Sequence, residues 1–405
     1  MQVPAYSSGK ISVMATPHWI GNDALVAHAF NKDASLMAIS INTNNVYILS
    51  VPRSSSEKFQ LKDILKEHSS LVTGLDWCPI SNQIVSCSAD RNAYVWKQNQ
   101  EGKWKPTLVA LQMNRAALCV RWSPLGNKFA VGAGSKLISI CFFEKEQDWW
   151  VPKHIKKQIK SSVTCLDWHP NNLLIACGST DYRVRVFSAF VKQVDDAEAD
   201  SSWGAKSPFQ TCLYEFYGGH GGWIHSLAFS ADGCKLAWVS HDSKVSIADT
   251  KAADGNPAVV TSLEHKYLPF ASCIWIGPNS ILAAGHDCAP IVFNYKGPGG
   301  GISEGTQIDT KSASQPTNKL SAMRKFQDID RMATTDNTGS RLATIHQNSI
   351  KYVFIPPVYW TCCELRIFKG DRNKAVQTTS IGQDGQLVIW DLVSLSSQIS
   401  GLSIN

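Results

Sequence analysis

The sequence contains one stretch in which the three residue types of a hydrolase triad are adjacent, Ser240-His241-Asp242. Adjacent side chains of a β-strand point to opposite faces, so these three cannot converge on one reacting atom. Gly285-His286-Asp287 occupies the equivalent place in a later segment and is interpreted in the same way. We therefore predict no catalytic residues and expect no enzyme; an active site assembled from several loops is the less favoured alternative.

The remaining candidates indicate neither a phosphate site nor a metal site. The glycine-rich stretch Gly218–Gly222 has neither the P-loop lysine nor the following helix that a phosphate cradle needs. The 12 cysteines form no C-x-x-C pair, and the adjacent Cys362 and Cys363 suit a shared metal poorly. Most other cysteines lie in apolar runs, where a thiol behaves as a small hydrophobic group. We therefore expect no metal, no cofactor and reduced cysteines.

Overall charge and hydropathy argue against two further classes of partner. Lys and Arg outnumber Asp and Glu by 39 to 33, and this net charge of +6 is too small and too dispersed to indicate nucleic-acid binding. No run approaches the ~18 apolar residues that a membrane-spanning helix needs. The first 16 residues lack the basic start and apolar run of a secretory signal. A cytoplasmic protein with no nucleic acid and no membrane span is expected.

The aspartates of these false triads belong to a repeat with a fixed internal spacing. Trp77 lies 13 residues before Asp90, and Asp90 lies six residues before Trp96. One or both spacings recur, within one residue, in the sets Trp168/Asp181/Phe187, Phe229/Asp242/Ala248, Trp275/Asp287/Phe293, Asp384/Trp390, Trp122/Ser135 and Phe30/Thr43. A unit of ~40–45 residues that holds four short strands is a propeller blade. The sequence therefore predicts an all-β fold, a single seven-bladed WD-repeat β-propeller over residues 1–405.

In WD-repeat proteins, which this spacing resembles, a loop histidine, a strand serine or threonine, the turn aspartate and the tryptophan form a hydrogen-bonded set. The whole set could be supplied here by His68, Ser88 or Ser86, Asp90 and Trp96, and half of another by His220 and Asp242. The corresponding structural positions of other blades are Asp181, Asp287, Asp384 and Trp390. Their turns are expected to rest on packing and backbone bonds alone. Ring closure requires an N-terminal strand, for which Lys10–Ala15 and Trp19–Ile20 are both candidates.

Two intervals are longer than the repeat. About 15 extra residues near Val194–Pro208 are acidic and indicate a solvated surface loop. The larger insertion, residues 295–345 between blades 6 and 7, opens with a glycine-rich stretch that is typical of a flexible arm. Within it, a segment without Gly or Pro predicts a short helix near residues 319–333.

On this helix, four apolar side chains would spread over about half the circumference, because they recur every third residue. They are Leu320, Met323, Phe326 and Ile329. A helix of ~15 residues is marginal in isolation and is expected to order against another surface. That surface is either its own propeller or the groove of a partner. We favour the partner, because the apolar arc is too broad for one shallow contact.

Basic residues gather between the third and fourth blades, after Trp149-Trp150. They are Lys153, Lys156, Lys157 and Lys160. One interpretation is a solvated outer edge strand that lysines protect from pairing. The other is a docking face for an acidic segment of a partner, to which charge would steer the two proteins.

Beyond the repeat, the chain resembles the WD-repeat subunits of the actin-related protein 2/3 complex, the assembly that nucleates branched actin filaments. The resemblance includes Asp90–Trp96, Trp104–Leu108, Asn114–Ala117, Asp148–Trp150, Lys153–Lys157, Leu166–Asn172, Ala237–Ser243, Ala283–Cys288, His346–Ser349 and the insertion itself. It implies a non-catalytic scaffold whose partners are the other subunits, the actin filament and the acidic tails of nucleation-promoting factors. It also implies a place in the actin cytoskeleton, at cortical patches or the leading edge.

The resemblance implies that the insertion helix binds actin or actin-related surfaces, with Arg324 and Arg331 flanking its apolar side chains, and that the lysine run contacts the acidic tails. Residues Lys351–Leu365 and the 16-residue interval from Phe368 to Asp384 depart from the family pattern. A different class remains as an alternative: a WD-repeat adaptor of a ubiquitin ligase or chromatin complex. Such an adaptor would bind peptides at the central opening and would not need the insertion.

Overall fold

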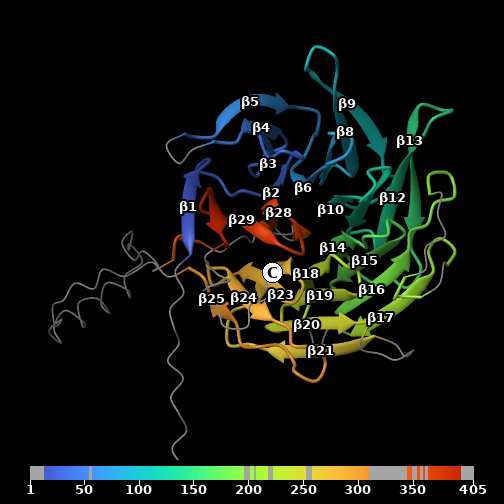
Figure 1. Cartoon of the computed structure of the whole chain (residues 1–405). Coiled ribbons are helices and arrows are strands. Elements are labelled where there is room, and N and C mark those ends of the chain that lie inside the picture. Colours follow the sequence, from blue (N-terminus) through green and yellow to red (C-terminus); the bar gives the residue numbers. More distant parts are fainter. Residues whose placement is uncertain are drawn as a thin grey trace, which may run out of the picture.

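Seven four-stranded antiparallel sheets surround a central axis (Figure 1), which confirms the predicted seven-bladed β-propeller. The computed structural model describes residues 13–53, 57–195, 201–204, 207–217, 222–251, 258–309, 344–348, 354–355, 359–360 and 364–393. The first strands of successive blades contact one another and therefore line the centre, while the fourth strands form the outer edge.

The first six blades are built from consecutive strands. Blades 1 to 3 comprise β2 (Ala27–Phe30), β3 (Leu36–Ser40), β4 (Val46–Ser50), β5 (Gln60–Leu65), β6 (Val72–Trp77), β7 (Ile84–Ser88), β8 (Asn92–Gln98), β9 (Trp104–Ala110), β10 (Ala117–Trp122), β11 (Lys128–Ala133), β12 (Leu137–Glu144) and β13 (Trp149–Ile155). Blades 4 to 6 comprise β14 (Val163–Trp168), β15 (Leu174–Ser179), β16 (Arg183–Ser188), β17 (Cys212–Tyr217), β18 (Ile224–Phe229), β19 (Lys235–Ser240), β20 (Lys244–Asp249), β21 (Val259–Glu264), β22 (Phe270–Gly277), β23 (Ser280–Gly285), β24 (Ile291–Asn294) and β25 (Thr306–Gln307).

Blade 7 combines the two ends of the described chain. It contains β28 (Leu365–Gly370), β29 (Ala375–Ile381), β30 (Gln386–Asp391) and, as its outer strand, β1 (Met14–Trp19). The pairing of β1 with β30 runs from Met14 opposite Asp391 to Trp19 opposite Gln386. The closing strand therefore overlaps both sequence candidates, and the N-terminal strand completes the last blade as predicted.

Burial follows the position of each strand in its blade. The inner strands β6 and β14 are buried along their whole length, because neighbouring blades cover both faces. Outer strand β21 is exposed except at Thr261 and Leu263, which are half-buried. The hydrophobic clusters lie between blades: Trp122 and Phe129 of blade 3 pack with Val85 and Val95 of blade 2. Each blade thus stabilises its neighbours, and apolar burial depends on a closed ring.

The insertion after blade 6 begins later than predicted. Residues 295–309 belong to blade 6, because Gly297 and Gly301 adopt positive φ in a turn that returns the chain as β25. The Asp309 carboxylate accepts a hydrogen bond from the Ile345 amide at 2.7 Å, so the chain returns to the point where it left. The predicted helix near residues 319–333 lies outside the described residues.

The excursion between β16 and β17 is not simply a solvated loop. Asp195 is buried and forms an ion pair with the buried Lys128 of blade 3. Further along, the buried Trp203 donates from its indole nitrogen to the carbonyl oxygen of Gly233 in blade 5 at 2.6 Å. The described ends of this excursion therefore pack across three blades, which acidic composition alone did not reveal.

The irregular spacing of blade 7 has a local cause. Strand β28 is irregular between Ile367 and Gly370, and a turn over residues 371–374 leads into β29. These extra residues account for the long interval before Asp384. Between His346 and Glu364, β26 (Phe354–Ile355) pairs with β27 (Tyr359–Trp360) as a small separate hairpin.

Deleting residues 1–19 tests the closing role of β1. Loss of the strand leaves the outer edge of β30 unpaired, and several backbone hydrogen bonds at ~1 kcal/mol each should disappear from the free energy of unfolding. We expect the truncated chain to unfold at a clearly lower temperature and urea concentration than a control chain that lacks only residues 1–12, which precede β1. Equal stability of the two truncated chains would contradict this closure.

Candidate functional site

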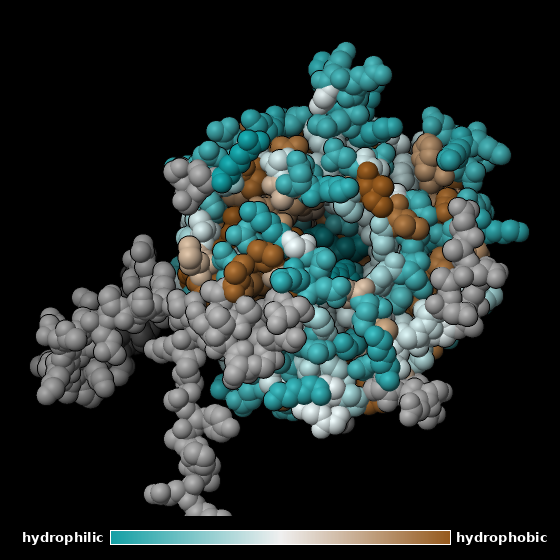
Figure 2. Space-filling view, viewed as in Figure 1, coloured by the Kyte–Doolittle hydropathy of each residue, from teal (hydrophilic) through white to brown (hydrophobic). Residues whose placement is uncertain are grey.

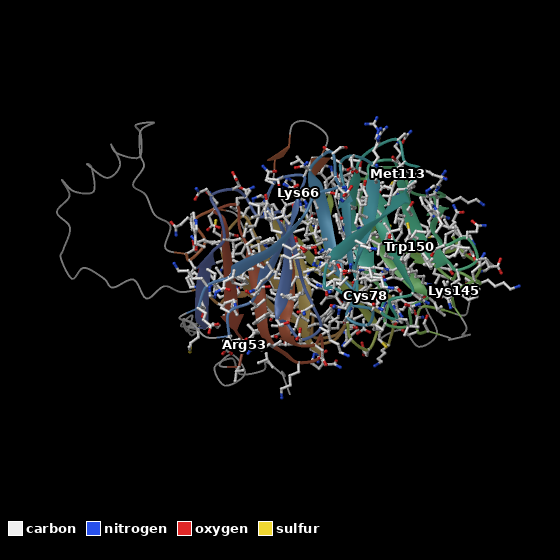
Figure 3. All side chains as sticks on the ribbon, turned by 90° about the horizontal axis from the view of Figure 1, so that it is seen from above. Arg53, Lys66, Cys78, Met113, Lys145 and Trp150 are labelled. Carbon is white, nitrogen blue, oxygen red and sulfur yellow. The ribbon has the colours of Figure 1, made fainter. Side chains whose placement is uncertain are left out.

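The propeller presents two faces with different loops (Figure 3). One face, which we call the upper face, is formed by the loops before each inner strand and the turns between the second and third strands. Lys66 and Met113 lie on it. The lower face carries the turns between first and second and between third and fourth strands; Cys78 and Lys145 mark it. Partners that contact the two faces would meet different side chains.

A complete hydrogen-bonded set occupies blade 2. His68 bonds Asp90 through Nδ1 and Ser86 through Nε2, each at 2.8 Å. The indole nitrogen of Trp96 donates to the same Ser86 hydroxyl at 2.9 Å. Burial alone would raise the pKa of Asp90, but the bonds from His68 and from backbone amides hold that pKa below its ordinary value. The chain therefore uses Ser86 in this set.

Ser88, the other serine that the spacing allows, is not a member of the set. Its hydroxyl donates to the carbonyl oxygen of Ser70 at 2.9 Å and accepts from the Asp90 amide at 3.1 Å. Alternate residues of a strand share a face, which is why spacing alone left both serines possible.

Blade 7 holds a second complete set that the spacing missed. His346 bonds Asp384 at 3.1 Å and Ser380 at 2.8 Å, and Trp390 donates to Ser380 at 2.8 Å. His346 precedes Asp384 by 38 residues, whereas His68 precedes Asp90 by 22. The segment between His346 and β28 separates the histidine from its blade in sequence, so the fixed spacing could not find it.

Four of the turn aspartates share one structural role, which is to hold the upper-face loops. In four blades the carboxylate accepts from a backbone amide of the loop before the inner strand. The pairs are Asp90 with Ser69, Asp181 with Lys160, Asp287 with Leu268 and Asp384 with Gln347. Asp242 accepts from the Ser240 hydroxyl and lies 3.7 Å from the Lys244 ammonium. His220 lies outside the described residues.

Blade 4 contradicts the expectation that degenerate blades rest on packing and backbone bonds alone. Arg185, fully buried, bonds Asp181 at 2.9 Å and Glu215 at 2.8 Å. A charged side chain takes the place of the histidine here, and the buried guanidinium requires the carboxylate partners that Asp181 and Glu215 supply.

The lysine run is divided between strand and loop. Lys153 lies in β13 with its ammonium 4.5 Å from the ring centre of Phe209. Lys156, Lys157 and Lys160 are exposed in the following upper-face loop, which Ile155 and Ile159 anchor in the core. The edge-strand interpretation therefore fits Lys153 alone, and the other three ammonium groups are free of carboxylate partners among the described residues.

The structure brings no catalytic constellation together at the false triad. Ser240 donates to Asp242, while His241 bonds His225 at 3.0 Å and approaches the Trp223 ring. Within the ranges described above, no three His, Cys, Asp or Glu side chains are placed to hold a metal ion. No helix in those ranges is both long and apolar enough to cross a bilayer.

Six charged side chains and one histidine lie around the centre of the ring, where Figure 2 shows a hydrophilic hollow. We call them the channel network: His28, Asp76, Arg121, Asp167, Glu364, Arg366 and Arg372. Glu364 bonds Arg121 at 2.7 Å and Arg366 at 3.0 Å, and it accepts from the His28 amide at 3.1 Å. Burial alone would raise the pKa of Glu364, but the two guanidinium groups hold that pKa at about 2. Burial lowers the pKa of His28 to about 3, so His28 is neutral.

The channel network joins blade 7 to three blades that are not its neighbours. Glu364 reaches Arg121 of blade 3, Arg366 reaches Asp76 of blade 2 at 2.9 Å, and Arg372 reaches Asp167 of blade 4 at 2.7 Å. Asp76 and Asp167 also accept from the Trp122 and Phe229 amides of the next blades, at 2.7 and 2.8 Å. Side chains of the propeller itself thus form ion pairs across the centre of the ring.

Comparison with known proteins supplies the family. The model of the WD domain, G-beta repeat, matches residues 59–97, 151–188 and 210–249. The chain is 48% identical over 383 residues to actin-related protein 2/3 complex subunit 1A-A of Xenopus laevis, covering 94% of this chain and 98% of the relative. Actin-related protein 2/3 complex subunit 1 of Schizosaccharomyces pombe is 36% identical over 90% of this chain and 96% of the relative. The subunit 1 of Saccharomyces cerevisiae is 33% identical over 96% of this chain and 100% of the relative.

The chain belongs to the actin-related protein 2/3 complex subunit 1 family. This confirms the resemblance drawn from the sequence.

In this subunit 1 family member, sequence reasoning missed the channel network. The signal was present: Leu-Asp-Trp occurs at residues 75–77 and again at 166–168, each time in a run that reads as a buried strand. A carboxylate on a strand buried on both faces needs a cationic partner. The partners lie in blade 7, where the repeat is irregular, so their identity required the structure.

Substituting Glu364→Gln tests the network and its pH dependence. At pH 7 the change removes the only carboxylate that forms an ion pair with the half-buried Arg121 among the described residues, and one of the two that pair with Arg366. It should lower the free energy of unfolding by about 3 kcal/mol. Because folding lowers the pKa of Glu364 from 4.5 to about 2, its contribution is complete above pH 4.5 and is lost as pH falls toward 2. The difference in free energy of unfolding between the wild-type chain and the variant, measured by urea titration, should therefore become smaller as pH falls over that range. A constant difference, or one no larger than for the exposed Glu67→Gln, would contradict the assignment.

Proposed function

We propose that this chain is a non-catalytic scaffold subunit of an actin-related protein 2/3 complex, supporting nucleation of branched actin filaments through protein–protein contacts. The main support for this proposal is the 33–48% identity to subunits of that name over nearly the full length of both chains. The Ser240-His241-Asp242 geometry, which lacks a serine–histidine relay, is consistent with a subunit that binds and does not catalyse. The location that follows is the cytoplasmic actin cytoskeleton, at cortical patches or the leading edge.

The insertion after blade 6 is proposed as the contact with actin or actin-related surfaces. Its apolar residues Leu320, Met323, Phe326 and Ile329 and the flanking Arg324 and Arg331 belong to the segment outside the described residues. The support from the structure lies at its base. The Asp309–Ile345 bond and the bonds of His346 and Gln347 to Asp384 fix both ends of the excursion where blades 6 and 7 meet. A fixed base lowers the entropic cost of presenting the segment to a partner.

The exposed lysines of the upper face are proposed to bind the acidic tails of nucleation-promoting factors. Lys156, Lys157 and Lys160 project from a loop that Asp181 holds through the Lys160 amide. Exposed Arg115 and Lys136 lie in the adjoining loops of blade 3, where the Arg115 amide donates to Ser135. Several cations on one face attract a polyanionic segment and raise its association rate.

Alanine substitution of Leu320, Met323 and Phe326 tests the insertion. Apolar anchors at the centre of an interface commonly contribute more than about 1 kcal/mol each, so branch formation should slow at least about tenfold in the triple variant. The assay is branch counting with complex reconstituted from the variant chain. Ser321→Ala with Gln327→Ala, polar positions in the same segment, should leave the rate unchanged. Unchanged branching by the triple variant would remove the insertion from the proposed function.

Charge reversal of Lys156, Lys157 and Lys160 to Glu tests the upper-face contact. We expect at least about tenfold weaker binding of an acidic tail peptide at low ionic strength, with the difference shrinking as salt screens the charges. Fluorescence anisotropy with the assembled complex measures both. The matched control reverses the exposed Lys58, Lys62 and Lys266, which lie on other blades. Equal loss of affinity in the control would show a general charge effect and no docking site.

A further inference from the structure

A groove opens at the lower face between the outer parts of blades 2 and 3, with a volume of about 890 Å³. Val95 of blade 2 and Phe143 and Trp150 of blade 3 form its apolar part, and Val194 of the β16–β17 excursion closes one end. Figure 3 places Trp150 between the two faces, above Lys145. The volume is in the range that holds several side chains of a bound segment.

The apolar surface continues beyond the groove onto two neighbouring turns. Ile80 and Leu125 are each 62% exposed, although both side chains are large and apolar. The turns touch, since a Cβ placed at Gly126 would lie 3.6 Å from the Cβ of Ile80. Ser81 and Gly126, which adjoin Ile80 and Leu125, line the groove itself. Contiguous exposed apolar side chains beside a concavity are typical of a protein–protein contact.

The opposite rim is acidic. The β12–β13 turn brings Glu144, Glu146 and Asp148 to the groove, against two lysines, Lys97 and Lys145. Glu146 and Asp148 are exposed, and no described cation forms an ion pair with any of the three carboxylates. The excess of unpaired carboxylates beside an apolar floor favours an occupant that carries both cations and apolar anchors.

The walls of the groove are preorganised. Val194 is held by its carbonyl oxygen, which accepts from Asn127 at 2.8 Å, and the adjoining Asp195 pairs with buried Lys128. Trp150 packs against Trp122, Phe129 and Phe143 with ring centres 5.1–5.8 Å apart. A site whose walls are fixed before binding loses less entropy when it is filled.

We propose that this groove docks a basic segment of another subunit, with an apolar side chain over Trp150 and Ile80 and Lys or Arg residues facing Glu144, Glu146 and Asp148. The inference rests on the proposed scaffold function, because it names a contact within that complex. It assigns the lower face to a basic partner, while the proposed acidic-tail site lies on the upper face. Both faces can therefore be engaged at the same time.

Zero-length carbodiimide cross-linking of the reconstituted complex tests this docking, because it joins a carboxylate only to a lysine in direct contact. We expect peptides containing residues 144–148 to be linked to a lysine of another subunit. The Glu144→Gln, Glu146→Gln and Asp148→Asn variant should lose these links. Reversal of the same three residues to Lys should speed exchange of the chain out of the complex at least about tenfold, whereas Asp63→Lys with Glu67→Lys, exposed on blade 1, should not.

Three results would overturn the docking proposal: links only to Lys311, Lys319 or Lys325 of the chain itself, links to a second copy, or no links from residues 144–148 with unchanged exchange. Ile80→Ser with Leu125→Ser provides a second measurement that does not depend on charge, and it should also speed exchange. If the wild-type chain does not co-elute with the other subunits, the scaffold function itself fails. If the chain co-elutes with the other subunits but the groove carboxylates form no cross-links to them, only the docking proposal fails.

Discussion

The burial of Glu364 among three blades is the interaction on which the rest of the structure depends. A buried carboxylate is tolerated only when donors surround it, and its donors come from blades 1, 3 and 7. Arg366 and Arg372 extend the same network to blades 2 and 4. The charges are therefore compensated only in the closed ring, which links the pairing of β1 with β30 to the centre of the molecule. Closure and charge burial should be lost together.

A closed ring gives the faces their separate chemistry. Turn aspartates hold the loops of the upper face, so the exposed Lys156 and Lys157 extend from an ordered backbone near the bond between Asp181 and the Lys160 amide. On the lower face, the Lys128–Asp195 pair fixes one wall of an apolar and acidic groove. The same blade repeat thus produces surfaces suited to partners of opposite charge, because the loops that join its strands differ in sequence from blade to blade.

The regular part of the fold was predictable, because it depends on a repeated local pattern. The 13- and six-residue spacings located the blades, and they correctly placed Asp90 and Trp96 within blade 2. Where an insertion breaks the spacing, local pattern fails: His346 lies 38 residues before its aspartate and was not recognised. Tertiary context was also needed to show that Asp195, in an acidic stretch, is buried beside Lys128.

The candidate surfaces were predictable only in part, for a related reason. A run of lysines can be read from the sequence, but its division between Lys153 on β13 and the exposed loop cannot, because it depends on where the strand ends. The groove between blades 2 and 3 joins residues from six separate stretches of the chain, and no sequence pattern connects them. Its apolar turn residues, Ile80 and Leu125, gain meaning only when they are seen side by side.

Purification of this chain from its own cells at mild salt, with mass spectrometry of everything that co-elutes, tests the scaffold claim most directly. We expect a single stoichiometric assembly that contains two actin-related proteins and this chain in equal amounts. Elution alone, or with ubiquitin-ligase or chromatin components, would contradict it and leave the propeller without the proposed role.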